Sequence, residues 1–209
     1  MNLIYVVSGM ERSGFPETPN WKPMMKWKNY YQPNTLYFFT SRITEKIHIL
    51  RTDDFKQIVV GSLQKYLDKY VVSLHGYVIM DNHIHILISA PTADGVKRCV
   101  QQTLRDSSCK MSRKLESFLD TPFASQAQSI LQIFAKHSNG KARYAVWKEQ
   151  ARGIPIDTPT VFHTQLDYIH NNPVRAQLVS EPSAYQFSSY LSIYQDKPGI
   201  LPIKSPTIL

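Results

Sequence analysis

The chain has 209 residues, of which 43% are hydrophobic, and its formal net charge is +8. This length and composition suit one globular domain with a proper core, and no run of residues is long and apolar enough to cross a bilayer. The sequence therefore argues against a membrane-spanning protein, and because no secretory signal is recognisable we expect a cytoplasmic location. The excess of positive charge predicts a polyanionic partner. Nucleic acid is favoured over a membrane surface, because no basic amphipathic anchor is visible.

The two ends of the chain differ in character from its middle. Residues 1–33 are rich in proline, tryptophan, asparagine and lysine, and this composition predicts an irregular N-terminal extension. We expect one folded domain over residues 34–195 and a C-terminal tail over residues 196–209. No internal repeat or low-complexity tract suggests a further division.

The first half of this domain alternates strand and helix patterns. Residues 36–43 are aromatic on both faces, which indicates a strand in the centre of a sheet. Residues 53–70 carry apolar side chains at helical spacing and should form an amphipathic helix. Strands are then expected at residues 71–80 and 83–89, and the two Asx residues between them suit the turn of a hairpin.

A pair of histidines lies just beyond this turn. Side chains alternate along a strand, so His83 and His85 should share one face while the isoleucines next to them point to the other. Two neutral imidazoles that converge on one point suit a divalent metal ion. The competing interpretation is a hydrogen-bonded histidine pair at a sheet edge. A structural zinc is disfavoured, because no thiolate or third histidine has suitable spacing.

A long basic helix is expected over residues 94–118, followed by a shorter helical segment at 130–134 and a strand at 141–148. Cys99 and Cys109 both fall on the long helix, about 15 Å apart, and should be free thiols. A basic helix face is commonly just solvated, but it can also contact phosphates. The expected nucleic-acid contacts are Lys97, Arg98, Arg105, Lys110, Arg113 and Lys114 on this helix, with Lys148, Arg152 and Arg175 beyond it.

The last predicted helix begins with Thr158 as its N-cap and Pro159 at its first position, and we expect Pro173 to end it. Its buried stripe is formed by Phe162, Leu166 and Ile169, and its outward stripe by His163, Asp167 and His170. The element order is then strand, helix, hairpin, helix, strand, helix. This order predicts an α+β fold, with helices packed on one antiparallel sheet in the ferredoxin-like or RRM-like manner.

Tyr168 and Asn172 are one turn apart on a third stripe of this helix and can address the same point. A hydroxyl nucleophile beside an amide oxygen is useful where a metal is bound, because the amide can complete the metal's ligands. Each residue also has a simpler interpretation. Tyr168 could be a half-buried core tyrosine, and Asn172 could only mark the end of a helix before proline.

Two segments, Asn82-His83-Ile84-His85-Ile86-Leu87 and Tyr168-Ile169-His170-Asn171-Asn172-Pro173-Val174-Arg175-Ala176, together resemble the REP-associated tyrosine transposases. Trp147 and the Phe187-Ser188-Ser189-Tyr190 segment also match that family's pattern, so that the resemblance covers roughly residues 34–194. It implies that the folded domain is a transposase-like catalytic domain. Two residues depart from the pattern: Asp81 stands where proline is common, and Gln177 replaces a glycine, which predicts a strained turn.

The resemblance implies a metal-dependent enzyme that cuts single-stranded DNA beside hairpins of repetitive extragenic palindromes, leaves a 5′-phosphotyrosine link and a free 3′-hydroxyl, and can rejoin strands. It implies that Tyr168 is the nucleophile and that His83, His85 and Asn172 bind Mg²⁺ or Mn²⁺. Imidazole ligands favour Mn²⁺ in affinity. Family members act as monomers or homodimers. Two alternatives stay open: a DNA or RNA hairpin-binding protein that does not cleave, and a metal-dependent hydrolase in which water attacks.

Overall fold

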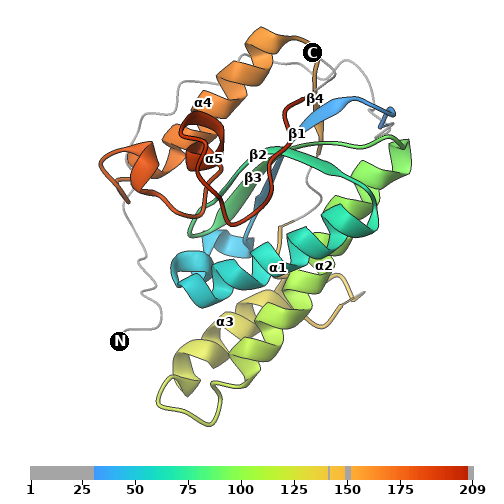
Figure 1. The fold of residues 1–209 in the computed structure, drawn as a ribbon. Coiled ribbons are helices and arrows are strands. Elements are labelled where there is room, and N and C mark those ends of the chain that lie inside the picture. The colour runs from blue at the N-terminus through green and yellow to red at the C-terminus, as the bar shows by residue number, and fades with distance from the viewer. Residues whose placement is uncertain (1–30, 141, 149–151, 207–209) are drawn as a thin grey trace, which may run out of the picture.

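A four-stranded antiparallel sheet is the centre of the computed structural model, which describes residues 31–140, 142–148 and 152–206 (Figure 1). The strands are β1 (Leu36–Arg42), β2 (Ser73–Ile79), β3 (His83–Ser89) and β4 (Ile154–Ile156), in the order β2-β3-β1-β4. β1 thus lies between β3 and β4, which confirms that it is central. This arrangement is the expected ferredoxin-like α+β fold. The predicted extension falls almost wholly on residues 1–30, outside the described part of the chain.

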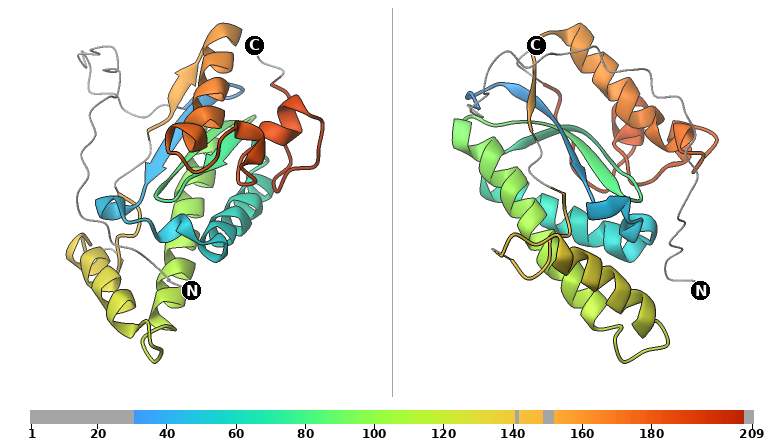
Figure 2. Two further views of the ribbon diagram at one scale, coloured as in Figure 1. Left: turned by 90° about the vertical axis from the view of Figure 1, so that its left-hand side faces the viewer. Right: turned by 180° about the vertical axis from the view of Figure 1, so that it is seen from behind.

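Helices cover both faces of the sheet (Figures 1 and 2). On one face, α1 (Asp53–Lys69) packs along α2 (Ala93–Glu116), and α3 (Ala124–Lys136) continues this layer beyond the sheet. On the other face, α4 (Pro159–Arg175) lies over β2, with the short α5 (Tyr190–Tyr194) beside it. Three single 3₁₀ turns occur in the connections: η1 (Thr44–Lys46), η2 (Ile49–Arg51) and η3 (Pro182–Ala184).

The alternation of side chains decides which residues meet which helical layer. The register pairs Thr40 with His85 and Arg42 with His83, so these four side chains share one face of β1 and β3. That face is the one that α4 covers. Gly76 of β2 allows the close approach, because a Cβ there would lie 2.6 Å from a methyl carbon of Leu166 on α4.

The predicted strand at residues 141–148 is wrong. Over its described part, residues 142–148, the segment forms only an isolated bridge, between Trp147 and Ile43, and the fourth strand is instead Ile154–Ile156. Three residues with a proline at the centre carry too little alternation to be recognised in a sequence. The proline is tolerated because β4 is an edge strand, where one side of the backbone needs no partner.

The predicted end of the last helix is also wrong, because Pro173 lies inside α4 and the helix continues to Arg175. A proline in the last turn removes one backbone hydrogen bond, and the turn closes beyond it: the N–H of Leu178 donates to the carbonyl of Pro173 (2.9 Å). Gln177 takes the left-handed conformation in this closure, with φ +57°, which confirms the expected strain at the position of the missing glycine.

Cys99 is buried and Cys109 exposed on α2, and both are free thiols, as predicted. The boundary of the catalytic domain at residue 195 stays a prediction. Leu201 is buried, and the N–H of Lys204 donates to the carbonyl of Leu74 in β2 (2.8 Å), so part of the expected tail packs against the sheet. In the described part of the chain, no helix combines the length and the apolar character that crossing a membrane requires.

Candidate active site

The histidine pair of β3 has the geometry that the alternation predicts. The ring centroids of His83 and His85 are 4.9 Å apart, and the two rings are nearly perpendicular. His85 is 2% exposed and stacks on Phe38 of β1, with 5.4 Å between the ring centroids. His83 is half-buried, nearer the rim. The strand therefore presents one imidazole at the floor of the site and the other at its edge.

α4 brings the two other predicted residues to these rings. The ring of Tyr168 stands edge-on to His85, with 5.4 Å between their centroids, and edge-on to Phe38. The side chain of Asn172 lies near enough to His83 to act on its pKa, and its Nδ2 donates to the carbonyl of Tyr168 (3.3 Å). The helix holds both residues over the sheet because Phe162, Leu166 and Ile169 bury its inner stripe, as predicted. The two histidines of β3 thus lie beside Tyr168 and Asn172 of α4, a segment far away in the sequence.

Both imidazoles are neutral at physiological pH. Burial lowers the pKa of His83 to about 4, Arg42 adds to this effect, and the nearby amide of Asn172 acts against it. Burial lowers the pKa of His85 to about 3, with His83 and Arg42 adding to the effect. A charged ring is disfavoured in both places because desolvation penalises the charged form. Neutral imidazoles keep a nitrogen lone pair, which a metal ion requires.

Hydrogen bonds orient the two rings. The hydroxyl of Thr40 is 2.8 Å from Nδ1 of His85, and Oδ1 of Asn82 is 2.7 Å from Nδ1 of His83. Both contacts use Nδ1 and leave Nε2 for another partner. Nε2 of His85 is buried and has no hydrogen-bond partner in the described structure. A buried polar atom without a partner is costly, and a cation would satisfy a lone pair there.

The residues present fit a divalent cation held by two imidazole nitrogens and the amide oxygen of Asn172. Among the described residues, no third histidine, cysteine or carboxylate joins the pair. A closed structural zinc site would need four such ligands. Three such ligands would leave positions for water and phosphate oxygens, as a catalytic metal site requires.

Two arginines stand at the rim of the site. The guanidinium carbon of Arg175, on the last turn of α4, lies 5.5 Å from the ring centroid of Tyr168. Arg42 is exposed at the end of β1, directly across from His83. Neither arginine has a carboxylate within 4.0 Å in the described part of the chain. The sequence analysis identified Arg175 and missed Arg42. Arg42 is two residues after Thr40 on the same strand, and this spacing could have indicated that both side chains are on one face of the sheet.

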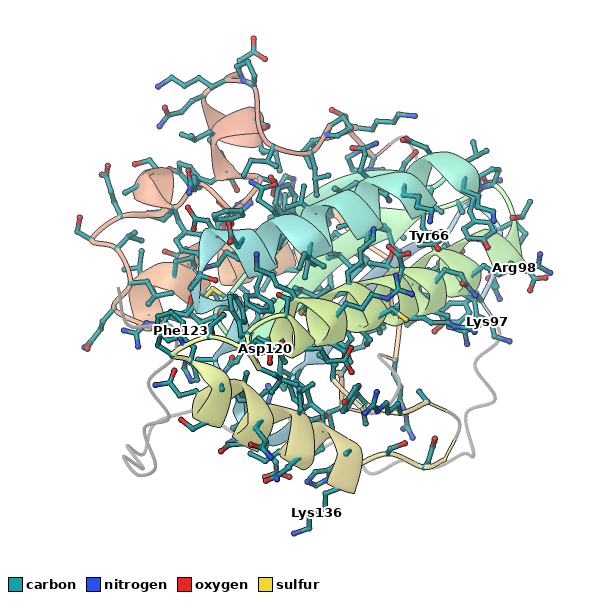
Figure 3. All side chains as sticks on the ribbon, turned by 90° about the horizontal axis from the view of Figure 1, so that it is seen from below. Tyr66, Lys97, Arg98, Asp120, Phe123 and Lys136 are labelled. Carbon is teal, nitrogen blue, oxygen red and sulfur yellow. The ribbon has the colours of Figure 1, made fainter. Side chains whose placement is uncertain are left out.

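The predicted cations of α2 lie in the other helical layer, behind the sheet as seen from the histidines (Figures 1 and 3). Figure 3 shows Lys97 and Arg98 near one end of this helix, at the edge of the molecule. Three of the six pair with carboxylates, namely Arg98 with Asp94, Lys110 with Asp106 and Lys114 with Asp54. The other three, Lys97, Arg105 and Arg113, have no such partner within the described residues.

Two of the predicted contacts, Lys148 and Arg152, lie between α3 and β4. Lys148 is exposed, and its N–H donates to the carbonyl of Arg42 (2.8 Å), so it lies beside the end of β1. Arg152 is exposed just before β4. His170, expected on the outward stripe of the last helix, is instead buried, with Nε2 2.8 Å from the hydroxyl of Ser189. The prediction failed because α5 and its preceding loop cover this side of α4.

The family model of IS200-like transposases matches residues 32–149, more than half of the 209 residues. The matched span contains His83 and His85 but ends before α4, which carries Tyr168 and Asn172. No curated protein matches the sequence.

Two solved structures are similar. A REP-associated tyrosine transposase bound to a REP hairpin aligns over 89% of this chain and 95% of its own, with 18% identity and a TM-score of 0.52. This likeness supports the fold. A candidate transposase from Deinococcus radiodurans R1 aligns over 71% of this chain and 97% of its own, with 15% identity and a TM-score of 0.39.

Proposed function

The chain belongs to the IS200-like transposase family and is a DNA-cutting and DNA-joining enzyme. We propose that it cuts single-stranded DNA beside hairpins and that Tyr168 becomes covalently bonded to a 5′-phosphate. The observation that carries this proposal is the edge-on approach of the Tyr168 ring to His85, 5.4 Å between centroids, beside an imidazole nitrogen that has no partner. The hairpin enters the proposal from the similar structure, which is bound to one.

The proposed reaction exchanges one phosphodiester for another. The Tyr168 oxygen attacks phosphorus, the bond from phosphorus to the 3′ oxygen breaks, and that oxygen leaves with a proton as a free 3′-hydroxyl. The product is a tyrosine ester of the 5′-phosphate, so the energy of the broken bond is kept. Attack by a 3′-hydroxyl on this ester reverses the step and joins two strands. A nucleophile of this kind splits one transfer into two similar ones.

The residues around Tyr168 have distinct proposed roles. The Tyr168 ring stands edge-on to the stacked rings of Phe38 and His85, which limits the direction in which its hydroxyl can point. Arg175 also lies against the Tyr168 ring, where its charge can bind the scissile phosphate. We propose that His83, His85 and Asn172 bind the metal ion. When bound, such an ion would polarise the phosphate and favour the deprotonated phenol.

Mg²⁺ and Mn²⁺ are the ions proposed. Two imidazoles give Mn²⁺ the higher affinity, while Mg²⁺ prefers an all-oxygen shell. Arg175 and Lys148, near the site, are proposed to contact the DNA close to the cleaved bond. The α2 cations and Arg152 are proposed as contacts to more distant phosphates.

The test is incubation of a 3′-labelled single strand carrying a hairpin with the full-length protein and Mn²⁺, followed by denaturing electrophoresis; the label is at the 3′ end because that fragment stays bonded to the tyrosine. We expect a covalent protein–DNA band that is absent from Tyr168→Phe. Tyr190→Phe is the matched control, because Tyr190 lies on α5 against His170, away from the histidine pair, and its loss should leave the band.

Two outcomes would contradict the proposal. Cleavage that survives Tyr168→Phe would mean that water attacks and that the protein acts as a hydrolase. Binding of the hairpin without any cleavage, in the presence of either ion, would contradict the catalytic role of this site and favour a binding protein.

A further inference from the structure

A buried ion pair lies behind the turn that carries the histidines. Lys56, in the first turns of α1, is 4% exposed, and its Nζ is 3.2 Å from Oδ1 of Asp81. Asp81 is 9% exposed and occupies the β2–β3 turn, two residues before His83. In the described structure neither residue has a ring contact or hydrogen bond with the two histidines, and Asp81 acts on His83 only through its charge, which raises the pKa of that ring.

The surroundings of Lys56 are aromatic. Its Nζ is 5.3 Å from the ring centroid of Phe187 and 5.8 Å from that of Tyr185. The hydroxyl of Tyr185 donates to the carbonyl of Ile79 at the end of β2 (2.8 Å). A lysine in such a place needs its carboxylate partner, because an unpaired buried charge is strongly destabilising. The pair and the aromatic rings together hold one side of the turn.

Backbone hydrogen bonds hold the other side of the turn. The N–H of Leu50 donates to the carbonyl of Asp81 (2.9 Å), and the N–H of Ile43 donates to the carbonyl of Asn82 (2.8 Å). The turn is therefore bound from α1, from η2 and from the end of β1. A turn that is held on three sides leaves Asn82 little freedom to move.

Asn82 determines which nitrogen of His83 carries the proton. Its Nδ2 donates to the carbonyl of Lys46 (3.2 Å), which assigns nitrogen and oxygen of the amide. Its Oδ1 can only accept, and it is 2.7 Å from Nδ1 of His83. Nδ1 must therefore be the donor, and in the neutral ring the lone pair lies on Nε2.

We propose that Lys56 and Asp81 form a positioning pair that holds Asn82 in place and thereby keeps His83 as the Nδ1-protonated tautomer. The inference rests on the proposed function, in which Nε2 of His83 is a metal ligand. The pair acts through Asn82 and takes no part in the chemistry.

The first test reads the tautomer directly. Long-range ¹H–¹⁵N spectra of metal-free, full-length protein labelled with ¹⁵N-histidine distinguish a protonated from an unprotonated ring nitrogen. We expect His83 of the unsubstituted protein to be protonated at Nδ1. Asn82→Ala and Lys56→Met should each produce a mixture of tautomers, whereas Lys56→Arg, which keeps a positive charge, should keep the single Nδ1-protonated tautomer. Lys65→Met is the matched control, because it removes an α1 lysine whose side chain is 55% exposed and whose partner, Asp106, lies on α2.

The second test measures Mn²⁺ affinity of the same proteins by calorimetry. Loss of a group that orients a ligand typically weakens metal binding about 10- to 100-fold, and we expect a loss in this range for Lys56→Met and for Asn82→Ala. If Lys56→Met does not fold, the double variant Lys56→Met, Asp81→Asn leaves no unpaired buried charge and takes its place.

The outcomes separate the two proposals. A folded Lys56→Met that keeps both the single tautomer and the Mn²⁺ affinity would overturn the positioning role. So would an unsubstituted protein in which Nε2 of His83 carries the proton. If the tautomer responds as expected but no Mn²⁺ binds to any of these proteins, the positioning pair stands and the proposed metal site fails.

Discussion

The two faces of the sheet differ in how their polar groups are satisfied. On the α4 face, His85 keeps a buried nitrogen without a partner, and the rim arginines have no carboxylate within reach among the described residues. On the α1–α2 face, the cations are more numerous, but Asp54, Asp94 and Asp106 pair with half of the predicted contacts. The number of cations therefore does not locate the chemistry. The α4 face differs in that a buried imidazole nitrogen without a described partner lies beside the tyrosine ring, and such an atom is costly unless a ligand uses it.

Among the variants that test this difference between the two faces, we expect the largest change in Mn²⁺ affinity for His85→Ala. Removal of one of the three proposed ligands should weaken Mn²⁺ binding by more than about a hundredfold, beyond the effect of losing an orienting group. Arg105→Gln, on the other face, should leave Mn²⁺ affinity unchanged. Calorimetry on both variants measures the difference. Equal affinities in His85→Ala and the unsubstituted protein would place the metal site elsewhere, provided that circular dichroism shows both to be folded.

Salt dependence of DNA binding provides the next comparison. Arg175→Gln and Arg42→Gln should each lower the slope of log affinity against log salt by about 0.7, the value for one phosphate contact on a single strand. Lys114→Gln should lower it by less, because Asp54 already neutralises Lys114 at 2.8 Å. Fluorescence anisotropy with a labelled hairpin strand, at several salt concentrations, measures the slopes. A larger change for Lys114 than for Arg175 would move the main DNA contact to the α2 face.

The buried imidazoles should make stability depend on pH. The pKa of His83 and of His170 is lowered to about 4 and that of His85 to about 3, in each case by burial. These rings stay neutral in the folded protein, whereas in the unfolded chain they bind protons below about pH 6.5. Unfolding therefore takes up protons between about pH 6.5 and 4, and the free energy of unfolding should fall as the pH falls through this window.

Each buried ring contributes a slope of up to about 1.4 kcal/mol per pH unit. Urea denaturation at pH 7.5, 6 and 5 measures the effect. His85→Asn should reduce the slope, while His163→Gln, which removes an exposed histidine on α4, should leave it unchanged. A free energy of unfolding that does not vary with pH would contradict the burial of these rings as neutral groups.

The smallest expected effects are at two helix ends, one on each side of the sheet. α1 ends before Val71 and α4 before Gln177, and both residues take the left-handed conformation, with φ +54° and +57°. Glycine is preferred at this position, so Val71→Gly and Gln177→Gly should each stabilise the protein by about 1 kcal/mol. Val71 should gain more, because it is β-branched. Thermal unfolding measures both changes, and a loss of stability in Val71→Gly would contradict the assigned backbone strain.

Several parts of the site could be predicted from short stretches of sequence. The alternation of a strand places His83 and His85 on one face, and the spacing of a helix places Tyr168 and Asn172 one turn apart. The end of α4 and the strand β4 could not be predicted in this way. Pro173 is tolerated because the last turn closes beyond it, and β4 is stabilised by pairing with β1 rather than by its own three residues.

The local sequence was enough to predict β3 and α4 and the side chains that each presents on one face, because side-chain periodicity is a local property of the backbone. It could not show that the histidines and Tyr168 lie together, that Arg42 belongs to the same rim, or that the α2 cations lie behind the sheet. Those relations depend on strand register and on which face each helix covers. Strand register and the face that each helix covers are set by the burial of apolar surface across the whole domain, and they cannot be deduced from one short segment.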